Sequence, residues 1–239
     1  MRPIIGITLD VAEKGSFSTR PHYALRTSYF DMIYKAGGLP VAIPYLHDAI
    51  DEYFQNISAL IVPGGDYALQ KDWYVDPEED KPYPPSERLD FDIAIVKKAL
   101  EKDIPLLGIC AGMQIMGGVL GAKMTPNINK FLDTEIDHLN QKPAEELAHD
   151  IVVEPDSLLY KITGKKKFAI NTAHAEAIIS VPDALSVSAK AEDGAIEAIE
   201  IANKNFALGV QWHPEFFLEE NDPNLLIVKA LVEKAREAG

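Results

Sequence analysis

The sequence has one cysteine, Cys110, among 239 residues, and one cysteine cannot form a disulfide within the chain. Lys and Arg number 23 against 37 Asp and Glu, so the formal net charge is −14. This shortage of positive charge argues against nucleic acid and against an anionic membrane surface as partners. No apolar run approaches the roughly 20 residues of a transmembrane helix. No leader-like stretch precedes the first apolar run, and we therefore expect a cytoplasmic protein.

Linkers rich in glycine or serine and internal repeats are also absent from the sequence. The apolar fraction of 47% and the charged fraction of 25% are typical of a chain that folds around a large core. We therefore expect a single domain spanning residues 1–239. Association into a homo-oligomer is left open by the composition.

Short apolar runs alternate with amphipathic stretches through the first half of the chain. The runs predict buried strands, and the stretches between them predict helices with one apolar face. The predicted strands are 3–8, 39–44, 59–65 and 104–109, and the predicted helices are 22–38, 48–57 and 87–103. The segment from 66 to 86 is long, rich in proline and charge, and predicted to be irregular; loops of this length are often functional.

The second half is predicted to be rich in strands and to close with a helix at 222–238. Short apolar runs separated by turn residues predict strands at 149–154, 166–171, 175–180, 185–190, 195–201 and 206–212. Together the two halves predict an α/β fold: a mostly parallel central sheet flanked by helices, with extra strands in the second half.

Cys110 lies between a predicted central strand and a predicted helix, in the pattern Gly-x-Cys-x-Gly. This pattern is typical of a nucleophile elbow, where a sharp turn lifts the reactive side chain above the sheet edge. Gly108 and Gly112 would let the backbone pack closely, and the N-terminus of the helix favours a thiolate. The N–H of Ala111 could stabilise an oxyanion, and Gly65, after the neighbouring strand, could supply a second N–H.

A cysteine nucleophile needs a base, and His213 with Glu215 follows the last predicted strand. Residues at i and i+2 of an extended segment project to the same side, so both can face one crevice. His213 would take the thiol proton, and Glu215 would orient the imidazole. The other five histidines have no comparable setting in the sequence.

A zinc site built from Cys110, His174, His213 and Glu215 is the competing interpretation. These residue types can bind zinc, but the paired spacings of common zinc sites do not occur. We therefore expect no metal. A carboxylate-bearing substrate would need local positive charge, for which the sequence does not rank Arg26, Lys71 and Arg88.

The motifs "PGG", "GICAGMQ" and "VQWHPE" resemble those of the class I glutamine amidotransferase superfamily. Further stretches, "YFDMIYKAGGLPVAIP", "NTAH" and "EDGAIEAIE", are similar to its γ-glutamyl hydrolase branch, which includes γ-glutamyl-γ-aminobutyrate hydrolases. The resemblance implies a flavodoxin-like fold, no cofactor, and a Cys-His-Glu triad at Cys110, His213 and Glu215. The other site positions that it implies are two oxyanion-hole N–H groups and one substrate-binding amide: Gly65, Ala111 and Gln114.

The sequence departs from this branch at two places near the implied site. Ala111 stands where the branch usually carries arginine, and His174-Ala175-Glu176 replaces a His-His-Gln segment. The triad is unaffected, because Ala111 would act through its backbone. The identity of the substrate is therefore not implied by the resemblance.

The sequence thus predicts a cysteine-dependent hydrolase that cleaves a small γ-glutamyl substrate through a thioester, releasing glutamate and an amine. Two alternatives stay open. The chain could be a glutaminase subunit that delivers ammonia to a separate synthetase, or a noncatalytic binding or regulatory protein on the same fold.

Overall fold

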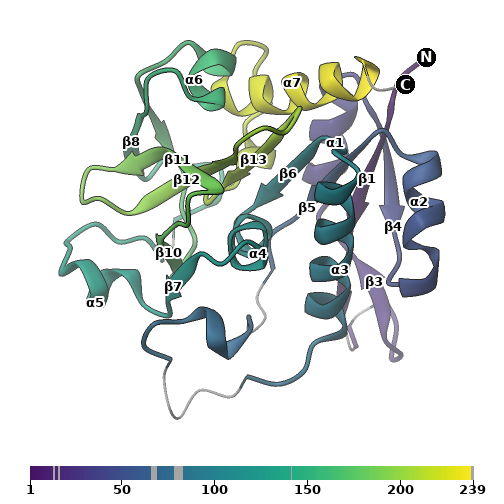
Figure 1. Ribbon diagram of the computed structural model, residues 1–239, viewed down its shortest axis with the longest axis horizontal. Coiled ribbons are helices and arrows are strands. Elements are labelled where there is room, and N and C mark those ends of the chain that lie inside the picture. Colours follow the sequence, from purple (N-terminus) through teal and green to yellow (C-terminus); the bar gives the residue numbers. More distant parts are fainter. Residues whose placement is uncertain (13, 16, 66–68, 78–82, 141, 238–239) are drawn as a thin grey trace.

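The computed structural model describes the chain except for residues 13, 16, 66–68, 78–82, 141 and 238–239. A nine-stranded sheet crosses the molecule in the order β4-β1-β5-β6-β13-β12-β11-β8-β9 (Figure 1). In that order the strands are Leu39–Ile43, Ile4–Thr8, Ala59–Val62, Leu106–Ile109, Ala207–Val210, Ile196–Ile201, Leu185–Ala191, His149–Val153 and Lys167–Ile170. The first five are parallel, and the other four extend the sheet with antiparallel pairing. The predicted fold class is confirmed.

Helices cover both faces of this sheet (Figure 1). One layer consists of α1 (Thr27–Lys35), α6 (Leu158–Thr163) and α7 (Pro223–Glu237), and the other of α2 (Ile50–Asn56), α3 (Glu87–Glu101) and α4 (Ala111–Val119). Smaller elements are the hairpin of β2 (Asp10–Ala12) with β3 (His22–Ala24), the pair β7 (Lys123–Thr125) with β10 (Ala177–Ser180), the helix α5 (Ile128–Leu132), and 3₁₀ turns at His47–Ala49, Lys71–Trp73 and Pro214–Phe216.

Helix α3 forms as its sequence predicts. The Ser86 side chain caps it by accepting a hydrogen bond from the Leu89 N–H at 3.2 Å. The apolar stripe at Leu89, Ile93, Val96 and Leu100 is buried against the sheet.

The prediction for residues 22–38 was wrong at its beginning. Residues 22–24 form strand β3, which pairs with β2, and α1 begins only at Thr27. The apolar residues Tyr29, Met32 and Ile33 do lie on α1, whereas Leu25 comes before the helix begins. Helix α6 was not predicted in the half of the chain expected to be rich in strands, and the Ser157 side chain caps it by accepting from the Tyr160 N–H.

The segment from 66 to 86 falls partly outside the described residues. Its described part contains the 3₁₀ turn Lys71–Trp73, and the buried Trp73 ring packs directly against Gly118 of α4. A side chain at position 118 would collide with that ring, because an added Cβ would lie 2.3 Å from it. This segment is therefore anchored to the helix that follows Cys110.

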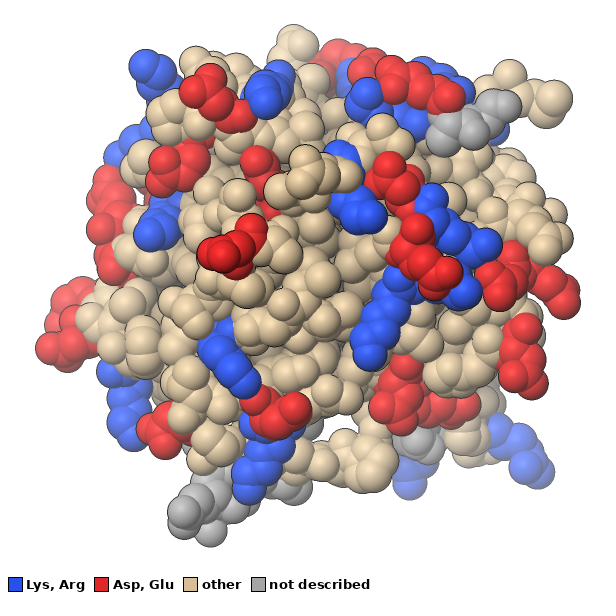
Figure 2. Space-filling model, viewed as in Figure 1, with Lys and Arg blue, Asp and Glu red and all other residues tan. Residues whose placement is uncertain are grey.

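Acidic and basic side chains lie interspersed on the face shown in Figure 2. The excess of acidic residues is therefore spread over this face and not gathered at one place. Among the described residues, no helix is long and apolar enough to cross a membrane.

Candidate active site

Cys110 occupies the sharp turn between β6 and α4. Its backbone has φ 53° and ψ −109°, a conformation that costs energy for a residue with a side chain, and its N–H donates to the Val210 carbonyl at 2.8 Å. A Cβ at Gly112 would lie 2.0 Å from the Val62 oxygen, and one at Gly108 would lie 2.6 Å from the Gly112 backbone. The two flanking glycines are therefore required by close backbone contacts, as the elbow pattern predicts.

We expect Gly112→Ala to destabilise the fold, because the Val62 carbonyl that its Cβ would strike belongs to the backbone of a central strand. The expected loss is about 3 kcal/mol, the upper end for overpacking, measured by urea unfolding. Gly15→Ala is the matched control, since a Cβ there meets nothing closer than 3.9 Å. We expect that variant to stay within about 0.5 kcal/mol of wild type. Equal stability of both variants would contradict the tight elbow.

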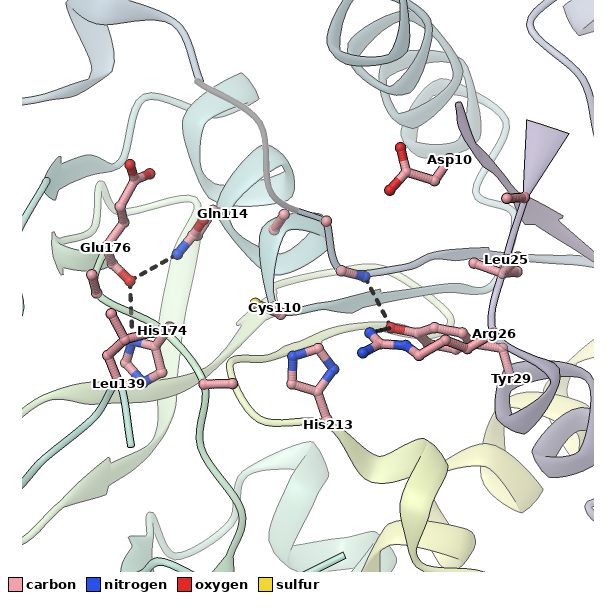
Figure 3. Close-up of a pocket in the computed structure, with 16 residues that line it drawn as sticks. Asp10, Leu25, Arg26, Tyr29, Cys110, Gln114, Leu139, His174, Glu176 and His213 are labelled. Atoms are coloured by element: carbon pink, nitrogen blue, oxygen red, sulfur yellow. Dashed lines mark hydrogen bonds between the residues drawn. The ribbon is translucent and has the colours of Figure 1, made fainter. Parts of the chain in front are cut away.

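His213 faces the Cys110 sulfur (Figure 3), and its Nδ1 lies 2.9 Å from Glu215 Oε1. Burial alone would lower the pKa of His213, but the hydrogen bond and charge of Cys110, together with Glu215, raise that pKa to about 10. The Glu215 carboxylate is fully buried, and Arg26 Nη2 lies 3.4 Å from it. A buried imidazole with this pKa is positively charged at neutral pH, and it favours the thiolate form of its cysteine neighbour.

The prediction that His213 and Glu215 lie on one extended segment was wrong. Residues Pro214–Phe216 form a 3₁₀ turn and not a continuation of the strand. The turn still brings the two side chains together, because Pro214 begins it directly after His213. The contact is therefore correct, and its local cause is different.

Two buried amide side chains that were not predicted from the sequence contact His213 and Cys110. Asn171 accepts from the His213 N–H at 2.9 Å and donates to the His213 carbonyl at 3.0 Å, which fixes the histidine backbone on both sides. Gln211 Nε2 lies 3.6 Å from Cys110 Sγ. Both side chains are at most 3% exposed. The only sign of these contacts in the sequence was the polar Gln211 in the otherwise apolar predicted strand 206–212.

The turn after β5 lies beside the elbow, as predicted from the neighbouring strands β5 and β6. Arg88 donates to the carbonyls of Pro63 and Gly64 at 3.1 and 2.9 Å, and the Gly64 N–H donates to the Tyr29 hydroxyl at 3.2 Å. An added Cβ at Gly64 would lie 2.8 Å from the His213 ring. These contacts fix the turn so that Gly65 lines the same cavity as Cys110.

The cavity has a volume of about 830 Å³ and opens at the carboxyl ends of the parallel strands, where α/β sheets bind ligands (Figure 3). Of the predicted site residues, five line it: Gly65, Cys110, Ala111, Gln114 and His213. Glu215 lies behind His213. Gln114 Nε2 donates to the Glu176 carbonyl at 2.9 Å and to Gln211 Oε1 at 3.2 Å.

The structure distinguishes among Arg26, Lys71 and Arg88 as candidates for binding a substrate carboxylate. Arg26 is the only lysine or arginine among the described residues that line the cavity. Arg88 is buried and supports the turn after β5, whereas Lys71 is exposed and outside the lining.

The four residues considered for zinc do not form a metal-binding group among the described residues. His174 lines the cavity, but its ring contacts the Glu176 carbonyl and the Glu197 carboxylate. It belongs to a separate cluster of histidines.

Comparison with solved structures defines the class of fold. The chain superimposes on a Thermoplasma acidophilum protein described as part of a GMP synthase, with a TM-score of 0.65 and 16% identity over 99% of this chain and 96% of that one. The glutaminase domain of CTPS from Trypanosoma brucei gives a TM-score of 0.63 at 17% identity, covering 97% and 94% of the two chains. These low identities establish the fold alone, which is that of glutamine amidotransferase domains.

Residues 3–215 match the Peptidase C26 family, and the chain belongs to it. A Rickettsia prowazekii protein described as glutamine amidotransferase-like is 34% identical over 277 aligned positions, covering 98% of each chain. The γ-glutamyl-γ-aminobutyrate hydrolase of Escherichia coli K12 is 29% identical over 222 positions, covering 90% of this chain and 86% of the relative. The resemblance seen in the motifs is confirmed, and the chain is a hydrolase or amidotransferase-like enzyme.

Proposed function

We propose that the chain is a cysteine-dependent hydrolase that cleaves the γ-glutamyl amide bond of a small molecule. The observation that supports it most is the His213 imidazole, which lies between the Cys110 sulfur and the buried Glu215 carboxylate beside a cavity of about 830 Å³. An activated thiolate beside backbone N–H groups is suited to acyl transfer.

The reaction begins when the Cys110 sulfur attacks the amide carbon of the γ-glutamyl group. The carbonyl oxygen becomes an oxyanion, which the N–H groups of Ala111 and Gly65 stabilise. His213 then donates its proton to the leaving amine, the C–N bond breaks, and a thioester remains on Cys110. Water attacks the thioester while His213 takes its proton, and glutamate leaves with the thiolate restored.

Gln114 and Arg26 are placed to hold the glutamyl part. The Gln114 amide nitrogen is committed to Glu176 and Gln211, so its oxygen is the atom that can accept from a substrate ammonium group. Arg26 is half exposed at the cavity wall and can receive a carboxylate. Its stacking near Phe216 restrains the guanidinium without burying it.

The leaving amine is expected to differ from that of the γ-glutamyl-γ-aminobutyrate hydrolases. Position 111 lacks an arginine, and Glu176 brings a carboxylate to the wall where the branch usually has glutamine. One change removes a positive charge and the other adds a negative charge, and both disfavour an amine carrying a carboxylate. We therefore expect a preference for amines with a neutral or positively charged distal end.

The proposal is tested by glutamate release from the purified chain alone. The panel contains glutamine, γ-glutamyl-aminobutyrate, a γ-glutamyl diamine, γ-glutamyl dipeptides and short poly-γ-glutamate. We expect release from at least one compound other than glutamine, with the diamine cleaved faster than the aminobutyrate derivative. Silence on the whole panel, combined with a thiol that resists alkylation, would overturn the hydrolase.

The second candidate is a glutaminase subunit, because both solved structures named above are described as parts of nucleotide synthases. It predicts a reactive thiol, no release by the chain alone, and glutaminase activity only when an ATP-dependent synthetase is added.

A further inference from the structure

Three histidines surround a buried carboxylate behind one wall of the cavity. Glu197 lies on β12, His149 begins β8, and His138 and His174 come from the loops before β8 and after β9. The side chains of these four residues are at most 8% exposed, and those of His138 and Glu197 are fully buried. The active-site chemistry proposed above uses none of them.

One oxygen of Glu197 is the centre of this cluster. Oε1 lies 3.2 Å from His149 Nε2, 3.3 Å from His138 Nδ1 and 3.5 Å from His174 Nε2. Ligands at about 2.0–2.1 Å from a tetrahedral zinc ion lie about 3.4 Å from one another. The distances from His138 and His174 to Glu197 therefore match edges of such a tetrahedron, and the ligand atoms of these three residues all lie within 4.8 Å of one another. His149 contacts Glu197 but does not belong to this group.

Hydrogen bonding alone leaves this cluster unsatisfied. His138 Nδ1, His174 Nε2 and Glu197 Oε2 are buried and have no hydrogen-bond partner. His174 Nδ1 faces the Glu176 carbonyl at 3.1 Å and must carry a hydrogen there, so in a neutral ring its Nε2 presents a lone pair towards Glu197. A lone pair beside a buried carboxylate oxygen is repulsive, and a shared cation removes the repulsion.

The outer contacts are those that metal-binding histidines usually make. His138 Nε2 lies 2.9 Å from Asp193 Oδ2, and His174 donates to a backbone carbonyl. A divalent ion would also balance the charge, because three neutral imidazoles, Glu197 and Asp193 together carry two negative charges.

We propose that His138, His174 and Glu197 hold a zinc ion, with Asp193 orienting His138 and with His149 donating to Glu197 from outside the ligand set. Three protein ligands leave the fourth position of a tetrahedral ion for a water molecule. The ion joins β12 to the two loops that carry Leu139 and Glu176 to the cavity wall. Through the Glu176 carbonyl it also positions Gln114, which shares that acceptor with His174 (Figure 3).

The test is metal binding by the full chain without a histidine tag, after dialysis against a chelator. We expect one equivalent of zinc per chain with a Kd below about 1 μM. Saturating zinc is expected to raise Tm by about 5–10 °C. Cobalt should give the intense visible bands of a four-coordinate ion without a thiolate charge-transfer band.

Variants distinguish this site from the catalytic cysteine. His138→Gln and His174→Gln should each weaken zinc binding by about 100-fold or more, whereas His47→Gln, at an exposed histidine, should bind as wild type. Cys110→Ala should also bind zinc and should keep the cobalt spectrum. This variant shows that the zinc site is separate from Cys110 even where a histidine variant does not fold. Binding weaker than about 10 μM, or zinc lost with Cys110→Ala, would overturn the proposal and leave the hydrolase proposal intact.

Discussion

We expect Cys110→Ala to lower glutamate release by about 10⁴-fold or more, because removal of a covalent nucleophile eliminates the thioester route. The variant should fold normally, since alanine removes one atom from a small buried site and leaves both flanking glycines in place. The measurement is kcat/KM on the best compound of the panel, with Tm measured in parallel.

Cys110→Ser is the matched variant, because it keeps the size of the side chain and a hydrogen-bonding atom beside His213. A hydroxyl is far less ionised than a thiol, so this variant is also expected to be nearly inactive. Activity within about tenfold of wild type in Cys110→Ala would contradict the mechanism. A loss of activity together with a large fall in Tm would require the serine variant to decide.

The sequence predicted the elbow because its determinants are local. A buried strand, two glycines and a helix lie within about 15 residues, and each has a direct physical signature. The parallel strands could also be placed, since β5 and β6 are continuous apolar runs in a chain that alternates strand and helix. The proximity of Gly65 to Cys110 followed from that alternation.

The supporting residues could not be predicted because their partners are distant along the chain. Asn171 meets His213 from 42 positions away, and Gln211 meets Cys110 from 101 positions away. The spacing of the histidines likewise gives no sign that three of them meet Glu197. Such contacts depend on the antiparallel half of the sheet, whose order the sequence does not determine.

The second large effect is expected at His213. Its pKa of about 10 lies above the ordinary value of 6.5, so the imidazolium is present at neutral pH and is lost as the pH rises through about 10. Below that pH its positive charge lies beside the Cys110 sulfur, and a neighbouring cation favours a thiolate. In wild type, the alkylation rate of Cys110 by iodoacetamide should therefore change little between pH 7 and pH 9.

His213→Asn removes this charge while keeping a polar side chain of similar breadth. An ordinary thiol, with a pKa of about 8.5, is only a few per cent ionised at pH 7, and the alkylation rate there should fall about tenfold once the higher nucleophilicity of the thiolate is allowed for. The rate should then rise steeply up to pH 9. Turnover should fall by a larger factor, on the order of 10²–10⁴, because the variant also lacks the proton donor for the leaving amine.

His47→Asn is the control, since it removes an exposed histidine and should leave both measurements unchanged. A flat pH profile that survives in His213→Asn would show that something other than the imidazolium stabilises the thiolate, such as the N-terminus of α4. The alkylation rate of Cys110 and the turnover rate report two separate roles of His213. The charge sets how readily the sulfur reacts with iodoacetamide, and the proton it carries sets how readily the amine leaves.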